Sequence, residues 1–133
     1  MNKEIFRTPL ADFEIKDGIL YVTYKKHAII NLEGAKEVVR ARSQYADNKP
    51  YPFLVIDDGV KTMDKAARDY FSDPNTGLKG VLAGALVLNS VYSEFLGNFY
   101  LKITKPIIPT KIFSDKEKAI KWLQQYTNKT GEQ

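Results

Sequence analysis

Residues 52–71 read PFLVIDDGVKTMDKAARDYF and give the clearest indication of the fold class. Its apolar run at 53–56 predicts a buried strand that ends at two aspartates and a glycine. After a short polar loop, apolar residues recur at positions 63, 66, 67, 70 and 71, the spacing of an amphipathic helix. A buried strand that leads through a loop into a helix is typical of an open α/β sheet, in which sites form at the carboxyl ends of the strands.

The residues before this stretch predict a hairpin and a helix. Asp17-Gly18 separates two β-prone runs, 13–16 and 19–24, and this pair favours a two-residue hairpin turn because both positions take positive φ. Asn31 is placed to cap a helix over residues 32–46. Residues 1–11 show no clear period and predict an N-terminal arm, either loose or paired as an edge strand.

The residues after this stretch predict two more strand–helix units. Residues 81–88, VLAGALVL, form a buried strand, and a helix follows over residues 91–104. Residues 110–113 form a short last strand, and Ser114 and Glu117 form a capping box at the start of the last helix. That helix is expected to turn four residues inward: Ala119, Ile120, Leu123 and Tyr126.

These elements give the order ββαβαβαβα in one α/β domain over residues 12–127, followed by a frayed polar tail at 128–133. A hairpin followed by alternating strands and helices predicts a mixed, largely parallel sheet with helices packed on it. We expect Ile56 and Leu86 to be buried in its central strands.

Composition narrows the class of protein. A length of 133 residues, with 44% hydrophobic and 27% charged residues, is typical of one soluble globular domain. The absence of cysteine excludes disulfides, thiolate nucleophiles and Cys-based metal sites. No apolar run approaches the ~18 residues of a membrane span, so we expect no transmembrane segment and a cytoplasmic location.

The net charge of +4 comes from residues 100–133, which hold 7 Lys and 3 acids. These lysines are interspersed through a helix and its flanks, and this segment has no arginine, the usual reader of bases. The pattern favours a solvated helix face, and we expect no nucleic-acid partner.

No group of residues predicts a catalytic centre. Asp57, Asp58 and Asp64 form a carboxylate cluster that would suit Mg²⁺ or acid–base chemistry if their oxygens converged. We favour a local role, in which the first two accept backbone N–H bonds in the loop and Asp64 caps the helix. His27, the only histidine, has no catalytic partner at a recognisable spacing. We therefore predict no enzyme activity, no metal site and no cofactor.

Several stretches carry a resemblance to a known family. Ile112-Phe113-Ser114-Asp115 is followed by Ala119 and Trp122-Leu123, while Ile56-Asp57 ends a strand and Met63-Asp64 starts a helix. This pattern resembles the STAS fold of the bacterial anti-sigma-factor antagonists and their SpoIIAA-like relatives, some of which are grouped with Sec14-like lipid-binding domains. The resemblance covers roughly residues 12–126.

The resemblance departs from the antagonists at one position. In those proteins a partner kinase phosphorylates a serine that follows the Met-Asp pair, whereas this chain has Lys65 there. The resemblance therefore implies the fold of the family but no phosphorylation switch at the start of this helix.

The resemblance implies a non-enzymatic regulatory module that binds a protein partner. Residues 59–62 fit neither the strand period before them nor the helix stripe after them, so we expect them to be exposed and available for recognition. The predicted partner-binding residues are Asp57, Asp58, Gly59, Val60, Lys61, Thr62, Asp64 and Lys65.

The alternative is the binding or sensing of a small apolar or lipid-like ligand, as in Sec14-like proteins. Phe99-Tyr100-Leu101 are consecutive and cannot share one helix face, so some aromatic surface should be exposed. An apolar groove between the second and third helices would favour this alternative. Its predicted lining is Met63, Tyr70, Phe71, Tyr92, Phe95 and Phe99.

Overall fold

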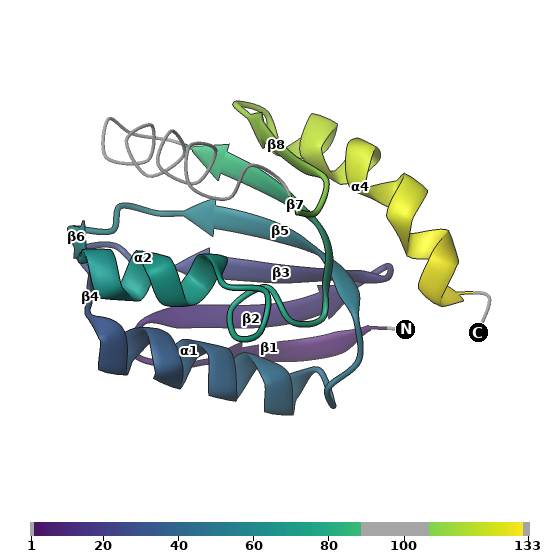
Figure 1. Cartoon of the computed structure of the whole chain (residues 1–133). Coiled ribbons are helices and arrows are strands. Elements are labelled where there is room, and N and C mark those ends of the chain that lie inside the picture. The colour runs from purple at the N-terminus through teal and green to yellow at the C-terminus, as the bar shows by residue number, and fades with distance from the viewer. Residues whose placement is uncertain (1, 89–106, 132–133) are drawn as a thin grey trace.

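The computed structural model describes residues 2–88 and 107–131, and its centre is a six-stranded sheet (Figure 1). The strands of this sheet are β1 (Lys3–Arg7), β2 (Ala11–Lys16), β3 (Ile19–Tyr24), β5 (Tyr51–Asp57), β7 (Val81–Leu88) and β8 (Thr110–Phe113). The helices are α1 (Leu32–Tyr45), α2 (Lys65–Ser72) and α4 (Lys116–Gly131). Two short strands, β4 (Ile29–Ile30) and β6 (Thr62–Met63), pair in a separate parallel sheet.

The predicted mixed, largely parallel sheet is confirmed. Its strands follow the order β1-β2-β3-β5-β7-β8, with β1, β2 and β3 antiparallel and the pairs β3–β5, β5–β7 and β7–β8 parallel. The hairpin turn lies where the sequence predicts it, with φ of 54° at Asp17 and 80° at Gly18. Residues 1–11 include an edge strand, β1, and the helix predicted over residues 91–104 lies outside the described residues.

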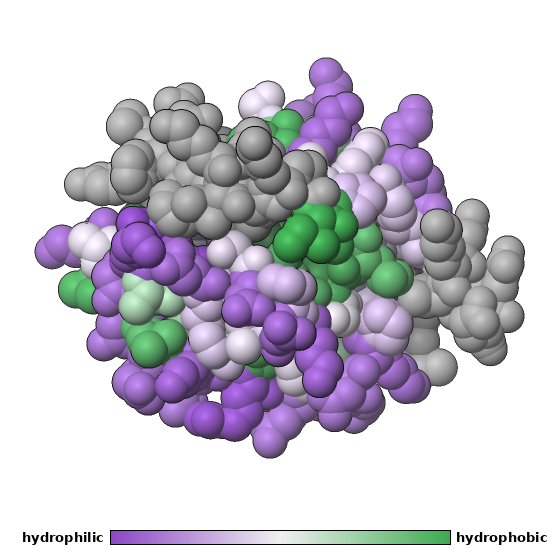
Figure 2. All heavy atoms as spheres, viewed as in Figure 1, coloured by the Kyte–Doolittle hydropathy of each residue, from purple (hydrophilic) through white to green (hydrophobic). Residues whose placement is uncertain are grey.

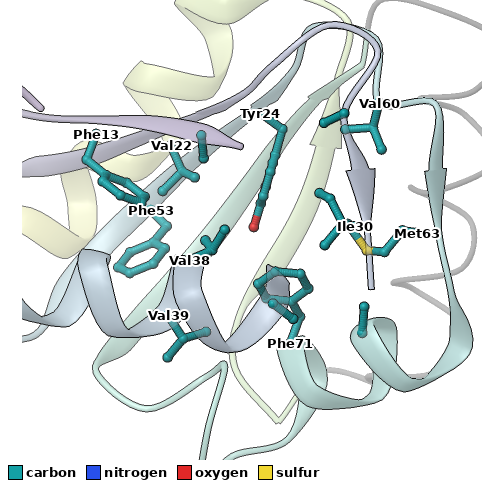
Figure 3. Packing of buried hydrophobic residues seen from close by; sticks show 14 of the residues in the cluster. Phe13, Val22, Tyr24, Ile30, Val38, Val39, Phe53, Val60, Met63 and Phe71 are labelled. Carbon is teal, nitrogen blue, oxygen red and sulfur yellow. The ribbon is translucent and has the colours of Figure 1, made fainter. Parts of the chain in front are cut away.

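Helices cover both faces of the sheet, and β3 shows why. Its alternate residues point to opposite faces, and both sets are apolar. Val22 and Tyr24 face the cluster beneath α1 and α2 (Figure 3), whereas Tyr21 lies in the cluster beneath α4. α1 and α2 lie side by side in front of the sheet in Figure 1.

The ends of the helices follow local hydrogen bonding. Asn31 caps α1 as predicted, because its side chain accepts a bond of 2.8 Å from the N–H of Gly34. α4 is capped by Asp115, whose carboxylate accepts from the N–H of Glu117 at 2.9 Å, so the predicted capping box at Ser114 is wrong by one residue. The inward residues predicted for α4 are confirmed, with Ala119 and Leu123 fully buried.

Three sequence-based expectations for the central elements need correction. α2 begins at Lys65, and Met63 belongs to β6, because pairing with β4 takes Met63 out of the helix. Ala66 is exposed, so the buried stripe of α2 is narrower than predicted. Leu86 is buried as expected, whereas Ile56 is only half-buried.

None of the helices within the described ranges combines the length and the hydropathy that a membrane span requires.

Candidate functional site

The predicted partner-binding residues lie at the edge of the sheet where the parallel strands β3 and β5 end, beside the small β4–β6 sheet (Figure 1). Asp57 ends β5, and its side chain is only 4% exposed. One carboxylate oxygen accepts bonds of 2.8 Å from the N–H groups of Gly59 and Val60. Asp64 caps α2 by accepting from the N–H of Ala67 at 2.9 Å. The local role predicted for Asp57 and Asp64 is therefore confirmed.

The backbone of this loop is tied to residues 27–30 by hydrogen bonds. The N–H of His27 donates to the carbonyl of Gly59 at 2.7 Å, and the N–H of Lys61 donates to the carbonyl of Ala28 at 2.8 Å. The N–H of Asp64 donates to the carbonyl of Ile30 at 3.1 Å. These bonds hold the loop as a second layer at the end of the main sheet.

Val60 departs from the sequence-based expectation that residues 59–62 are exposed. Its side chain is only 2% exposed and packs in the core beneath α1 and α2, as does that of Met63 (Figure 3). The reason is that β4 and β6 form a layer over this part of the core, so that the side chains beneath this layer are removed from water and are apolar. Sequence reasoning missed this layer because two-residue strands leave no periodic signal.

The exposed side chains at this edge form what we call the loop-edge surface, defined as Ile29, Asp58, Lys61, Thr62 and Lys65. Ile29 is 62% exposed and lies opposite Thr62 in the β4–β6 register. Lys65 is paired within α2, since its ammonium lies 2.8 Å from the carboxylate of Asp69. This surface thus combines one apolar side chain with charges of both signs.

A second candidate place was not predicted, and it is centred on Arg42 of α1. The side chain is 6% exposed, and its guanidinium donates a bond of 3.0 Å to the carbonyl of Gly77. The guanidinium carbon lies 4.9 Å from the centre of the Phe53 ring. The signal was present in the sequence, because position 42 follows Val38 by four residues and Val39 by three and so continues the buried stripe.

Two cavities share Arg42 and Phe53 in their linings, and we call them the inner and the outer cavity. The inner cavity has a volume of about 70 Å³ and is lined by apolar side chains of the sheet together with Tyr24 and Phe71. The outer cavity has a volume of about 280 Å³ and lies between the end of α1, the end of α2 and residues 75–80. Figure 2 shows that hydrophilic residues cover most of this face of the molecule over α1.

Tyr24 brings a buried hydroxyl to the inner cavity. The side chain is 6% exposed, and its ring points from β3 toward α1 and Phe71 (Figure 3). Burial raises the pKa of Tyr24 to about 12, while the nearby charge of Arg42 acts in the opposite direction.

The predicted apolar groove is only partly within the described residues. Met63 and Phe71 are buried in the core, and Tyr70 is half-buried against the outer cavity. The other three predicted residues, Tyr92, Phe95 and Phe99, lie outside the described residues. Across residues 2–88 and 107–131, no group of three or more His, Asp or Glu side chains is placed to hold a metal ion.

Comparison with known families places the chain. The model of a domain of unknown function, DUF7793, matches residues 13–127. The chain belongs to the DUF7793 family. No curated protein matches this DUF7793 sequence.

Two solved structures are similar to this DUF7793 chain. The first is the crystal structure of an uncharacterised protein of the DUF3478 family from Shewanella loihica PV-4, which has a SpoIIAA-like fold. It has 18% sequence identity and a TM-score of 0.56, and the match covers 85% of this chain and 91% of that protein. The second is a protein of unknown function from Arthrobacter sp. FB24, with 30% identity, a TM-score of 0.31, and coverage of 84% and 89%. The first match confirms the SpoIIAA-like fold that the sequence resembles.

Proposed function

We propose that the protein is a non-enzymatic regulatory interaction module that binds a protein partner through the loop-edge surface. The observation that supports the proposal is the combination of a fixed backbone and exposed side chains at this edge. Asp57, Val60 and Met63 are buried and hold the loop from below, while Lys61, Thr62 and Lys65 point outward. Recognition residues concentrate on loops that rigid elements position.

The fixed backbone reduces the cost of binding. A loop that is ordered before it meets its partner loses less conformational entropy when the complex forms, so more of the contact energy appears as affinity. The bonds from Gly59 and Val60 to the carboxylate of Asp57, at 2.8 Å each, supply this order. The loop thus presents its side chains in one arrangement.

The exposed residues indicate the chemistry of the partner. Ile29 supplies an apolar contact at the centre of an interface, and Lys61 and Lys65 supply cations beside it. Desolvated apolar centres with charged rims are typical of transient protein interfaces. We expect the partner to present an apolar side chain surrounded by carboxylates.

Charge reversal at two lysines tests the proposal. The Lys61→Glu/Lys65→Glu variant is expected to lose every partner that the immobilised wild-type protein retains from a lysate of its source organism. Both side chains are exposed, and the Lys65–Asp69 pair at the surface contributes little, so the melting temperature should stay nearly unchanged.

The matched control reverses two lysines on the opposite face of the molecule. Lys118 and Lys121 are exposed on α4, so Lys118→Glu/Lys121→Glu produces the same change in net charge at a distance from the loop. This control should retain the partners. The proposal fails if the wild-type protein retains no protein, or if the Lys61→Glu/Lys65→Glu variant retains the same ones.

A further inference from the structure

We propose that the outer cavity is a binding site for a small hydroxylated phosphate ester, with the phosphate at its cationic mouth. This site is separate from the loop-edge surface, because it lies at the C-terminal end of α2 and the loop-edge surface lies at the N-terminal end. The eight residues of α2 place the two ends about 12 Å apart. Neither proposal depends on the other.

The charges that line the outer cavity are all positive. Arg42 forms part of its buried wall, and Lys49 and Lys79 are exposed at its mouth. No aspartate or glutamate of the described residues lines it. Asp47, just after α1, lies 3.4 Å from the ammonium of Lys3, and Asp73, just after α2, accepts from the N–H of Asn75 at 2.7 Å. Three cations around one cavity favour a dianion such as a phosphate ester.

The backbone brings the two lysines of the mouth together. The N–H of Tyr51 donates to the carbonyl of Gly80 at 3.0 Å, which joins the segment after α1 to the segment before β7. The carbonyl oxygen of Lys49 lies 3.9 Å from the position that a Cβ on Gly80 would take. Lys49 and Lys79 therefore stand on adjacent segments and can approach the same ligand.

Two features oppose an anion, namely the negative ends of the α1 and α2 dipoles. Each is about half an elementary charge and comes from free carbonyls in the last turn. At α1 such carbonyls are bonded, since the N–H of Asn48 donates to Ser43 at 2.9 Å and the N–H of Lys49 donates to Ala46 at 3.0 Å. At α2 the carbonyl of Tyr70 accepts from the N–H of Gly77 at 3.0 Å and from the hydroxyl of Thr76 at 2.6 Å. Three full positive charges therefore outweigh what remains of the two dipoles.

The remaining lining suits hydroxyl groups on the ligand. Ser43, Asn75 and Thr76 place hydroxyl and amide groups on the wall of the outer cavity. The hydroxyl of Thr76 already donates to the carbonyl of Tyr70 at 2.6 Å, so its oxygen is left to accept a bond from a ligand hydroxyl. A polar wall around a cationic mouth discriminates between a hydroxylated ester and a bare anion.

The inner cavity limits the size of the ligand. Its volume of about 70 Å³ is less than half that of the ~150 Å³ apolar cavity that accepts benzene in a well-studied case. The inner cavity has room for a short extension or water, which the hydroxyl of Tyr24 could bind, but no aromatic ring. The bulk of the ligand must therefore stay in the outer cavity.

Titration of the ¹⁵N-labelled full chain with glycerol 3-phosphate, inorganic phosphate and glycerol tests the proposal. The amide signals of Gly80, which lines the outer cavity, and of Gly77, whose carbonyl accepts from Arg42, report on this site in two-dimensional NMR spectra. Glycerol 3-phosphate is expected to shift them with saturation, and to bind about threefold or more tighter than inorganic phosphate because the ester also has hydroxyls to bond. Glycerol alone should shift neither signal.

Neutralising the mouth provides the decisive variant. Lys49→Gln/Lys79→Gln is expected to weaken glycerol 3-phosphate about tenfold or more, because two charges near the phosphate are lost. Lys118→Gln/Lys121→Gln removes the same net charge on the other face and should change the affinity less than about twofold. Folding of both variants is checked by their spectra.

Three outcomes would overturn the proposal: no shift at Gly77 and Gly80 up to about 10 mM ligand, equal affinities in the two lysine variants, or equal affinities for the ester and inorganic phosphate. Loss of protein partners in the loop-edge experiment would leave these results untouched.

Discussion

Asp57 shows at the scale of one residue how a buried carboxylate shapes a loop. Its oxygen accepts two N–H groups at 2.8 Å, and the backbone turns between them at Gly59, where φ is 118°. A carboxylate that accepts backbone N–H groups forms stronger bonds than a neutral acceptor. The position of the loop-edge surface thus depends on a residue that the surface itself does not expose.

Replacing Asp57 tests this role. Asp57→Ala removes the oxygen that accepts both bonds and should lower the free energy of unfolding by about 2–3 kcal/mol, whereas Asp57→Asn keeps one side-chain oxygen and should cost less. Urea denaturation followed by circular dichroism measures both values. Equal losses for the two variants would show that the charge of the side chain matters more than the acceptor oxygen.

Tyr24 predicts a dependence of stability on alkaline pH. Its pKa is raised by burial from 10.0 to about 12, so the unfolded chain releases this proton at lower pH than the folded one. The stabilisation is complete below pH 10 and is lost as pH rises toward 12. By pH 11 the loss from this group should be about 1.4 kcal/mol.

Comparison with Tyr24→Phe isolates this effect. The variant has no phenolic proton at position 24, so its free energy of unfolding should fall less between pH 9 and pH 11 than that of the wild-type protein. Urea denaturation at each pH gives the two values. Parallel losses in the two proteins would mean that Tyr24 ionises as easily in the folded state as in the unfolded state.

Val60 and Arg42 show what single residues hide from sequence reading. Arg42 lies on the buried face of α1 with Val38 and Val39, although a charged residue is usually exposed because a buried charge is costly. Its hydrogen bond to the carbonyl of Gly77 and its contact with the Phe53 ring offset the loss of hydration of the guanidinium, and both partners are remote in sequence. Val60 is buried for a similarly remote reason, the layer made by β4 and β6.

At the scale of elements, the segment between α2 and β7 depends on close packing at Gly77. The N–H of Gly77 donates to the carbonyl of Tyr70 at 3.0 Å, and its carbonyl accepts from Arg42. A Cβ at this position would lie 2.1 Å from the carbonyl oxygen of Phe71 and 2.3 Å from its Cα. The segment can therefore hold its place only if position 77 has no side chain.

Gly77→Ala should consequently displace the segment and lower the free energy of unfolding by about 3 kcal/mol or more. Gly84→Ala is the matched control, because no heavy atom lies within 4 Å of its added Cβ. That control should change stability by less than about 0.5 kcal/mol. Urea denaturation distinguishes them, and a small effect at Gly77 would mean that the segment adapts freely.

The central strand β5 offers a second comparison between two residues of one face. Leu54 is fully buried against α4, whereas Ile56 is half-buried in the same cluster. Leu54→Ala should cost about 2–5 kcal/mol through lost burial and the cavity it leaves. Ile56→Ala should cost about 1–2 kcal/mol because less of its surface is removed from water. Thermal and urea unfolding measure both losses of stability, and a larger loss at Ile56 than at Leu54 would mean that Ile56 is the more deeply buried of the two.

For the whole molecule, long regular patterns were predictable and short or remote contacts were not. The Asp17-Gly18 hairpin, α1, the strand at 81–88 and the inward face of α4 all follow from periodicity and turn chemistry. The β4–β6 layer and the cavities around Arg42 arise where segments distant in sequence meet, and no local pattern encodes such meetings. The sequence therefore predicts the loop of the candidate site, but not the β4–β6 layer and the buried side chains that support this loop.

Removing residues 2–9 tests where the domain begins. The Tyr45 hydroxyl donates to the carbonyls of Lys3 and Glu4 at 2.9 and 2.6 Å, and the Phe6 ring stacks on Tyr45 with centres 6.1 Å apart. The shortened chain should stay folded, because β1 is an edge strand with exposed side chains, but lose about 1–3 kcal/mol of stability. Circular dichroism shows whether the shortened chain is folded, and urea denaturation measures its loss of stability. An unchanged stability would show that residues 1–11 are only an arm.

The strand order has a consequence for synthesis on the ribosome. Among the described strands of the main sheet, each one lies beside the strand that precedes it in the chain, so none has to insert between two others. The β2–β3 hairpin needs only a two-residue turn and can close first, after which β5, β7 and β8 each meet an edge that is already in place. α4 is the last of the described elements to emerge, and it packs on the face of the sheet opposite α1 and α2.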